Sequence, residues 1–158
     1  MKIMQRVESL QPLSKEHKSV LMSCLLIRKG VDKQAPVDII TDFFLQCWNK
    51  EIVPHFEKEE AILIPLLEKY PKGKSLAATV LRDHDLIRNG VIHLNQKALN
   101  ERLIKDLADQ LEKHIRYEER IVFQEMQDFI PALELAKLHI VENGHSSICN
   151  TYPNHFWE

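Results

Sequence analysis

The most informative feature of the sequence is a pair of short segments with the same residue pattern. A glutamate follows a histidine by four residues in both His55–Glu60, which reads HFEKEE, and His114–Glu119, which reads HIRYEE. On a helix, positions four residues apart lie on one face, so each segment presents an imidazole beside a carboxylate. Imidazole nitrogens and carboxylate oxygens are common ligands of transition metals. The two segments therefore predict a metal-binding function.

The apolar residues indicate that these segments lie on long helices. They recur at alternating intervals of three and four residues, and the chain has only four glycines. We expect an all-α fold, with an antiparallel up-down-up-down four-helix bundle and a short extra C-terminal helix. The predicted helices cover residues 15–29, 36–70, 75–99 and 101–128, and the fifth runs from Pro131 to about Asn143 and Gly144. Pro54 and Pro65 are expected to kink or loosen the second helix.

Each predicted helix has an apolar stripe that polar residues interrupt at one or two positions. A histidine interrupts the first and third stripes, and a histidine with a glutamate interrupts the second and fourth. After these glutamates, the stripes are expected to continue inside the bundle at Ile62 and Ile121. Six candidate metal ligands are thus expected to meet in the interior: His17, His55, Glu59, His84, His114 and Glu118.

Burial of these six groups requires compensation. A buried polar group without a partner costs about 1–3 kcal/mol, and a buried charge costs more. Six such groups would exceed the roughly 5–15 kcal/mol of stability that a domain has. Six ligands are too many for one tetrahedral zinc, so their number indicates two ions bridged by the two carboxylates. Nitrogen and oxygen ligands favour two iron ions, with manganese or zinc as substitutes. A hydrogen-bonded polar core is the alternative.

Charged neighbours of the six residues each have two interpretations. Glu60 and Glu119 directly follow a candidate ligand, and are either solvated charges or partners of the ligands. Arg88 either faces solvent or pairs with an acid such as Glu60. For His84, an ordinary ion pair with a flanking aspartate, Asp83 or Asp85, is the alternative to metal ligation.

Once these residues are considered together, the sequence resembles the hemerythrin-like family of HHE cation-binding domains. The similar motifs lie within about residues 10–143 and are Ser14–His17, His55–Glu60, Asp83–Arg88 and His114–Arg120. The resemblance implies a non-haem di-iron centre in a four-helix bundle, with Glu59 and Glu118 as bridging ligands and the four histidines as the others. It also implies O2, another small diatomic molecule or peroxide as the ligand.

The sequence departs from the oxygen carriers of this family at two positions. Arg88 stands where carriers have a second histidine, and Glu118 follows its histidine by four residues where carriers have an aspartate at five. We therefore expect a protein that binds or senses O2, or handles iron or redox stress, without a catalytic residue. A di-iron oxidase or peroxidase-like enzyme is the alternative, and a bundle that uses metal only for stability is another.

Composition and charge set further limits. The 158 residues have a formal net charge of −2 and scattered basic residues, so we expect no nucleic-acid partner and no membrane partner. We expect one domain, residues 1–158, whose tail 144–158 docks through Phe156 and Trp157. Glu16 and Glu57 are expected at the surface. Three widely spaced cysteines and an N-terminus without an apolar stretch favour a cytoplasmic location.

Overall fold

The chain is helical, as the apolar spacing predicts. The computed structural model describes residues 5–96, 100–142, 144 and 146–158, and these contain helices but no strand. The α-helices are α1 (Gln11–Asp32), α2 (Val37–Cys47), α3 (Val53–Lys58), α4 (Ile64–Glu68), α5 (Pro71–Gln96), α6 (Glu101–Tyr117), α7 (Phe123–Phe129), α8 (Ala132–Leu135) and α9 (Ile148–Thr151). The predicted end of the third helix at Leu99 lies outside the described residues.

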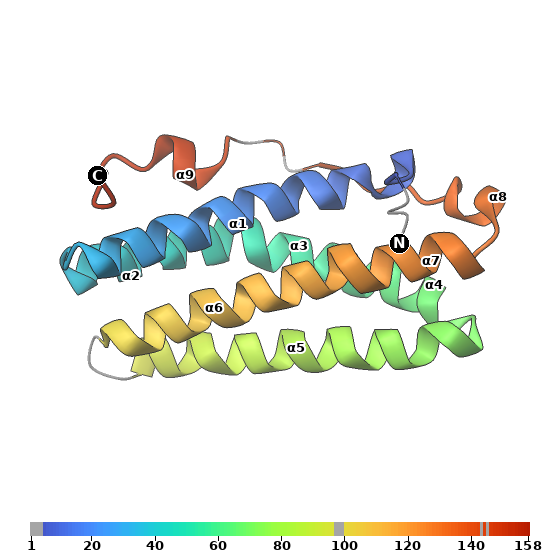
Figure 1. The fold of residues 1–158 in the computed structure, drawn as a ribbon, viewed down its shortest axis with the longest axis horizontal. Coiled ribbons are helices and arrows are strands. Elements are labelled where there is room, and N and C mark those ends of the chain that lie inside the picture. Colours follow the sequence, from blue (N-terminus) through green and yellow to red (C-terminus); the bar gives the residue numbers. More distant parts are fainter. Residues whose placement is uncertain (1–4, 97–99, 143, 145) are drawn as a thin grey trace.

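The long helices lie side by side as a helical bundle (Figure 1). Helix α1 packs against α2 and α6, while α5 packs against α4 and α6. Asn100 is the N-cap of α6, because its side chain accepts hydrogen bonds from the backbone N–H groups of Arg102 and Leu103. No helix in the described part of the chain is both long enough and apolar enough to cross a membrane.

Three π-turns interrupt the helices, at Trp48–Ile52, Glu59–Leu63 and Glu118–Val122. The first two directly precede α3 and α4, each of which has a proline, Pro54 or Pro65, as its second residue. Proline lacks an N–H group and its ring clashes with the carbonyl four residues earlier, so the wider turn accommodates it. The third π-turn contains no proline, and nothing in the apolar spacing indicates it.

The π-turns change which side chains face the interior. A π-turn adds about one residue to a helical turn, so the buried position moves by one. Leu63 and Val122 are fully buried, whereas Ile121 is 42% exposed. The prediction that Ile121 lies inside the bundle is therefore wrong, and Ile62 is only partly buried.

The apolar core consists of two clusters with a polar layer between them. On α1, Leu13 belongs to one cluster and Val20 to the other, and the buried His17 lies between them in the chain. On α5, Val80 and Ile87 flank His84 in the same way. The bundle thus buries its histidines at one level between two apolar regions.

The bounds of the first helix and of the last predicted helix differ from those expected from the sequence. Helix α1 begins at Gln11, with Pro12 in its first turn, so Ser14 is not the N-cap but lies inside the helix. Gly30 does not end α1, which continues to Asp32. The helix expected from Pro131 to Gly144 is reduced to the four residues of α8, and its predicted end at Asn143 lies outside the described residues.

The C-terminal tail docks on the bundle, as Phe156 and Trp157 suggest. The Phe156 side chain is 7% exposed and contacts the Phe43 ring edge-on, with ring centroids 5.2 Å apart. Tyr152 donates a hydrogen bond of 2.7 Å to the Asp42 carboxylate. A Cβ atom at Gly30 would lie only 2.5 Å from a ring carbon of Phe156. Gly30 is therefore required for close approach of the tail.

This contact generates a prediction about stability. Gly30→Ala should destabilise the apo-protein by about 1–3 kcal/mol, because the overlap with Phe156 outweighs the roughly 1 kcal/mol that alanine gains over glycine in a helix. Phe156→Ala alone should cost about 3 kcal/mol. In the Phe156→Ala background, Gly30→Ala should lose most of its destabilising effect, because the remaining close contact of the added Cβ is Ile40 at 3.2 Å. Urea denaturation of the four proteins measures this coupling, and additive effects would contradict the packing described here.

Candidate metal centre

The structure brings all six predicted side chains together in the polar layer. None is more than 2% exposed. They form two overlapping groups of potential ligand atoms, each lying within 4.8 Å of one another, and both groups contain Glu59 and Glu118. The remaining members are His17 and His55 in one group, and His84 and His114 in the other.

The two shared glutamates divide their oxygen atoms between the two groups. Glu59 places Oε2 3.3 Å from His55 Nε2 and Oε1 3.1 Å from His84 Nε2. Glu118 places Oε1 2.9 Å from His17 Nε2 and Oε2 3.3 Å from His114 Nε2. This is the arrangement that two bridging carboxylates need, with one oxygen available to each of two ions.

Both shared glutamates begin a π-turn. Glu59 and Glu118 are the first residues of the turns Glu59–Leu63 and Glu118–Val122. In each case the histidine four residues earlier still lies in regular α-helix. The histidine and glutamate therefore share a face, while the wider turn sets the direction of the helix beyond the site. Such turns occur frequently at functional sites.

Each of the four histidines also contacts a carboxylate through its other ring nitrogen. His17 Nδ1 lies 2.6 Å from Glu119, and His55 Nδ1 lies 2.8 Å from Glu16. His84 Nδ1 lies 2.6 Å from Glu60, and His114 Nδ1 lies 3.1 Å from Asp83. An ionised carboxylate only accepts hydrogen bonds, so each Nδ1 donates and each neutral ring keeps its lone pair on Nε2.

These outer carboxylates follow one rule of position. Each is the chain neighbour of a candidate ligand, but it bonds the histidine of an adjacent helical segment. Glu16, next to His17 on α1, bonds His55, and Glu60 bonds His84 on α5. Asp83 on α5 bonds His114 on α6, and Glu119 returns to His17. The four contacts form a closed ring around the bundle.

Three of the four outer carboxylates are held in turn by a cation. Arg6 lies 3.3 Å from Glu119, Lys58 lies 2.5 Å from Glu16 and Arg88 lies 2.8 Å from Glu60. Arg88 thus pairs with Glu60, which decides between its two interpretations. Its guanidinium also lies 5.6 Å from the centre of the Phe56 ring. Arg88 therefore supports the site from outside and is not among the six interior groups.

One expectation about a neighbouring acid is wrong, and one alternative interpretation is excluded. Glu16 is only 9% exposed and bonds His55, whereas we expected it at the surface. The ion pair considered for His84 does not form with Asp83, which bonds His114 instead, and Asp85 is an exposed residue near Arg88. The available signal was adjacency, because every outer carboxylate directly precedes or follows a candidate ligand. That signal does not specify which helix it serves.

Neighbouring carboxylates shift the pKa values of the interior histidines. Burial disfavours the charged imidazolium of His114, but the charge of Glu118 and the hydrogen bond to Asp83 outweigh it and raise the pKa to about 10. The pKa values of His17 and His55 are also raised, because their carboxylate partners outweigh burial. Burial opposes ionisation of Glu59, yet His55 and His17 hold the pKa of this carboxyl well below its usual range. The interior therefore attracts cations.

Several interior atoms have no hydrogen bond, which tests whether metal ions fit this site. Glu59 Oε2, both carboxylate oxygens of Glu118 and Nε2 of His114 are buried without a hydrogen-bond partner among the described residues. His17 Nε2 and His55 Nε2 lie only 3.0 Å apart, although both carry lone pairs when the rings are neutral. Unpaired oxygens and converging lone pairs are the donors that divalent cations require. The residues therefore fit two metal ions.

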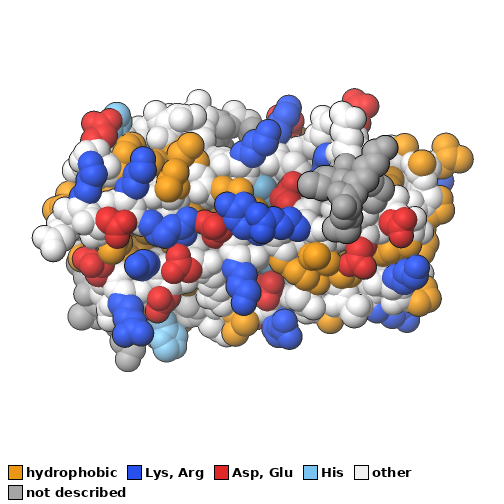
Figure 2. Space-filling view, in the orientation of Figure 1, with side chains coloured by type: hydrophobic (Ala, Val, Ile, Leu, Met, Phe, Trp, Pro, Cys, Tyr) orange, Lys and Arg blue, Asp and Glu red, His pale blue; other side chains and the backbone are white. Residues whose placement is uncertain are grey.

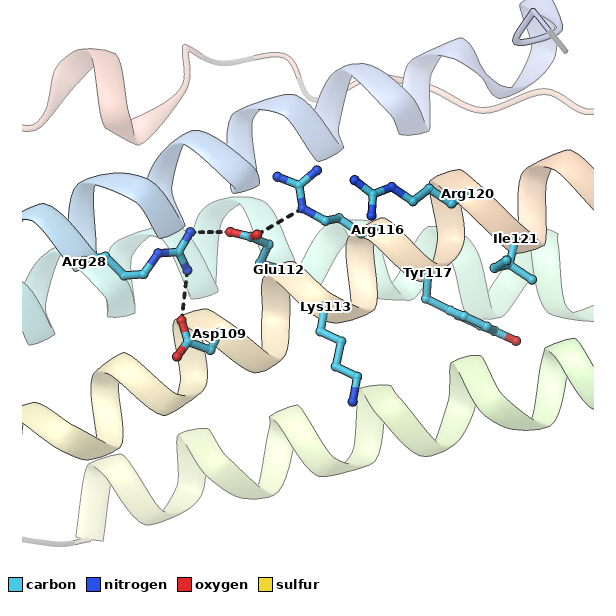
Figure 3. Close-up of a pocket in the computed structure, with 8 residues that line it drawn as sticks. All are labelled: Arg28, Asp109, Glu112, Lys113, Arg116, Tyr117, Arg120 and Ile121. Atoms are coloured by element: carbon cyan, nitrogen blue, oxygen red, sulfur yellow. Dashed lines mark hydrogen bonds and ion pairs between the residues drawn. The ribbon is translucent and has the colours of Figure 1, made fainter. Parts of the chain in front are cut away.

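A groove of about 630 Å³ between α1 and α6 is a different feature (Figure 3). Its acids are already paired, because Arg28 bonds both Asp109 and Glu112, and Arg116 lies 3.0 Å from Glu112. These contacts join α1 to α6 at the surface. The groove contains none of the six interior residues and is not the candidate centre.

The outer carboxylates generate a prediction about metal affinity. Glu60→Gln should weaken metal binding by roughly 10–100-fold, because the amide no longer orients His84 as an ionised acceptor. Glu57→Gln, an exposed substitution of the same chemistry in the same segment, should leave the affinity unchanged. Competition with a chromophoric chelator measures both constants, and equal affinities would contradict the role assigned to Glu60.

The raised histidine pKa values predict opposite pH effects on stability and metal binding. Folding raises the pKa of His114 from 6.5 to about 10, so its stabilising contribution to the apo-protein is complete below pH 6.5 and is lost as the pH rises toward 10. Metal affinity should rise over the same range, because metals must displace these protons. Urea denaturation and metal titration across this range test both slopes, and apo-protein stability that does not fall would contradict the prediction.

Comparison with known proteins agrees with this geometry. The sequence matches the hemerythrin HHE cation binding domain over residues 9–126, a region that contains all six interior residues and their four outer carboxylates. No curated protein and no solved structure matches the chain. The match covers more than half of the sequence, and members of this family bind metal cations through such helical domains. The chain therefore belongs to the hemerythrin HHE cation-binding family.

Proposed function

We propose that this protein holds two iron ions and uses them to bind or sense O2 or a related small oxidant. One observation carries the proposal: the two groups of ligand atoms overlap at Glu59 and Glu118, whose oxygens divide between them. Each ion would receive two imidazole nitrogens and one oxygen from each bridging glutamate. Four protein ligands leave positions open for a further ligand at ions that prefer higher coordination numbers.

The donor set supports iron. It contains nitrogen and oxygen but no thiolate, and two-carboxylate sites in helical bundles suit redox-active first-row metals. When bound, a ferrous pair supplies electrons and open coordination positions to O2, NO or peroxide. The protein contributes the orientation of the imidazoles through the ring of outer carboxylates, and holds each proton on Nδ1 so that Nε2 stays available.

The surroundings of the site support a small ligand rather than an organic substrate. The six residues are almost completely buried. Phe56 stacks on His84 with ring centroids 3.8 Å apart, and Phe123 stacks on His17 at 5.6 Å. Both phenylalanines are at most 1% exposed, so they form apolar walls beside the two halves of the centre. A molecule of two or three atoms can reach such a buried centre with less displacement of these walls than a larger one.

Arg88 supports sensing over reversible carriage. It occupies the position at which carriers in this family are expected to have a further histidine, but here it pairs with Glu60. The two halves of the centre therefore each have two histidines, and neither half is closed by a third. Two iron ions held by these residues would keep more open positions than in a carrier, which would favour oxidation over reversible O2 binding.

The finer structural expectations belong to the same proposal. We propose that the bundle has the antiparallel up-down-up-down four-helix topology, which the short connections between its long helices support. Residues 1–158 would then form one domain with the C-terminal tail docked on it. We further propose that the protein acts in the cytoplasm. On the face shown in Figure 2, acidic and basic side chains are intermingled among the described residues, with no broad patch of one sign.

Anaerobic loading with ferrous iron tests the proposed function. Apo-protein should take up two irons per chain at the histidine-containing centre, and Glu59→Gln combined with Glu118→Gln should remove both of these ions because the bridging oxygens are halved. When O2 is admitted, the visible spectrum should change once, without sustained O2 consumption in an oxygen electrode.

The other outcomes have distinct meanings. A spectral change that reverses under vacuum would replace sensing by carriage. Continued O2 consumption with a supplied reductant would indicate an oxidase, and uptake of fewer than two irons would refute the di-iron centre. Zinc bound equally well with no response to O2 would leave a purely structural metal site.

A further inference from the structure

We infer that the protein has a second cation site, outside the six-residue centre, at a pocket between α1 and the C-terminal segment. The pocket has a volume of about 150 Å³. Three carboxylates line it: Glu16 and Glu51 from the helices, and Glu142 from the segment that follows α8. We propose that it binds a hydrated divalent cation of the first transition row and delivers it to the centre.

Glu51 is the residue that carries this inference. Glu51 is only 5% exposed, and its Oε2 atom has no hydrogen-bond partner in the part of the chain that the structure describes. Its Oε1 atom accepts a 3.0 Å hydrogen bond from the backbone N–H of Ile148. Among the described residues, no lysine or arginine forms an ion pair with Glu51. Glu51 thus lines the pocket and carries a buried carboxylate oxygen that a cation would satisfy.

The other pocket groups add oxygen atoms and set the charge. Ser19 lies 3.5 Å from Glu51 Oε1 and also contacts the hydroxyl of Ser147, and both serines line the pocket. Lys15 is the basic residue of the lining, and it forms an exposed pair with Glu142, 3.2 Å apart. Lys58 pairs with Glu16 from outside the pocket lining, so the two ammonium groups match Glu16 and Glu142, and the charge of Glu51 is left to make the pocket negative. Oxygen donors with negative charge select hard divalent cations.

The position of Glu16 connects this pocket to the centre. Glu16 lines the pocket, and its Oε1 atom bonds Nδ1 of His55 at 2.8 Å. The exposed Glu142, the buried Glu51 and Glu16 therefore form a series of carboxylates from the surface to a candidate ligand. Such a series concentrates cations at the site and raises their rate of arrival. Delivery rests on the proposed function, whereas cation binding in the pocket does not.

Mn²⁺ titration of the apo-protein, followed by the electron paramagnetic resonance signal of free Mn²⁺, tests the site. We expect three bound ions per chain in the wild type and two in Glu51→Gln, which keeps a carbonyl oxygen for the Ile148 N–H. Glu68→Gln, an exposed glutamate at the end of α4, should still bind three. Two ions in the wild type, with no change in Glu51→Gln, would overturn the inference.

A centre-disabled variant separates the two proposals. Glu59→Gln with Glu118→Gln should still bind one Mn²⁺, and adding Glu51→Gln should remove it. A wild type that binds a single ion, lost in Glu51→Gln but kept in the centre-disabled variant, would refute the two-ion centre while supporting the pocket site. No binding in the centre-disabled variant would refute the pocket site. Circular dichroism of each variant confirms that it is folded.

Stopped-flow uptake of Co²⁺, whose absorbance reports ligation by histidine, tests delivery. Glu51→Gln should slow uptake roughly tenfold without changing the final number of ions in the centre, because one charge of the approach is lost. Lys15→Gln should speed uptake, since it removes the ammonium beside Glu142. Unchanged uptake in Glu51→Gln would overturn the delivery role.

Discussion

The structure depends on one electrostatic constraint: six ionisable side chains occupy a single layer between two apolar clusters. Water does not solvate them there, and Glu59, His84 and Glu118 have no exposed surface at all. The bundle can close around this layer only if positive charge balances the two interior carboxylates. Protons on His17, His55 and His114, whose pKa values are raised, supply it in the apo-protein, and metal cations would supply it in a loaded protein. Folding is therefore coupled to protonation of the histidines and to metal binding, because each supplies positive charge to the buried carboxylates.

The interior layer could be predicted from the sequence because its members repeat with helical spacing. A histidine and glutamate four residues apart on an otherwise apolar stripe are sufficient to place His55 with Glu59, and His114 with Glu118, inside the bundle. The structure confirms the all-helical fold and brings His17 and His84 to the same layer. A residue type that is costly to bury is thus a strong marker of position when it appears where only apolar residues are expected.

The remaining features depend on contacts that spacing along one helix does not specify. The π-turn at Glu118 shifts the buried position from Ile121 to Val122, and no proline marks it. Glu16 was expected in solvent because its type is usually exposed, yet Lys58 and His55 compensate its burial from another segment. The partner of Asp83 is His114 rather than the adjacent His84. Partner choice is set by how the helices face each other, which a single sequence does not show.

The closed ring of outer carboxylates has a mechanical consequence. Each of the four long helical segments bears at least one interior ligand and also holds the histidine of its neighbour. Axial sliding of one segment therefore pulls on rings belonging to two others. Because the four contacts close on themselves, a displacement of one segment is passed to the next segment through its histidine. The ring therefore resists independent movement of any one segment and couples the positions of all four.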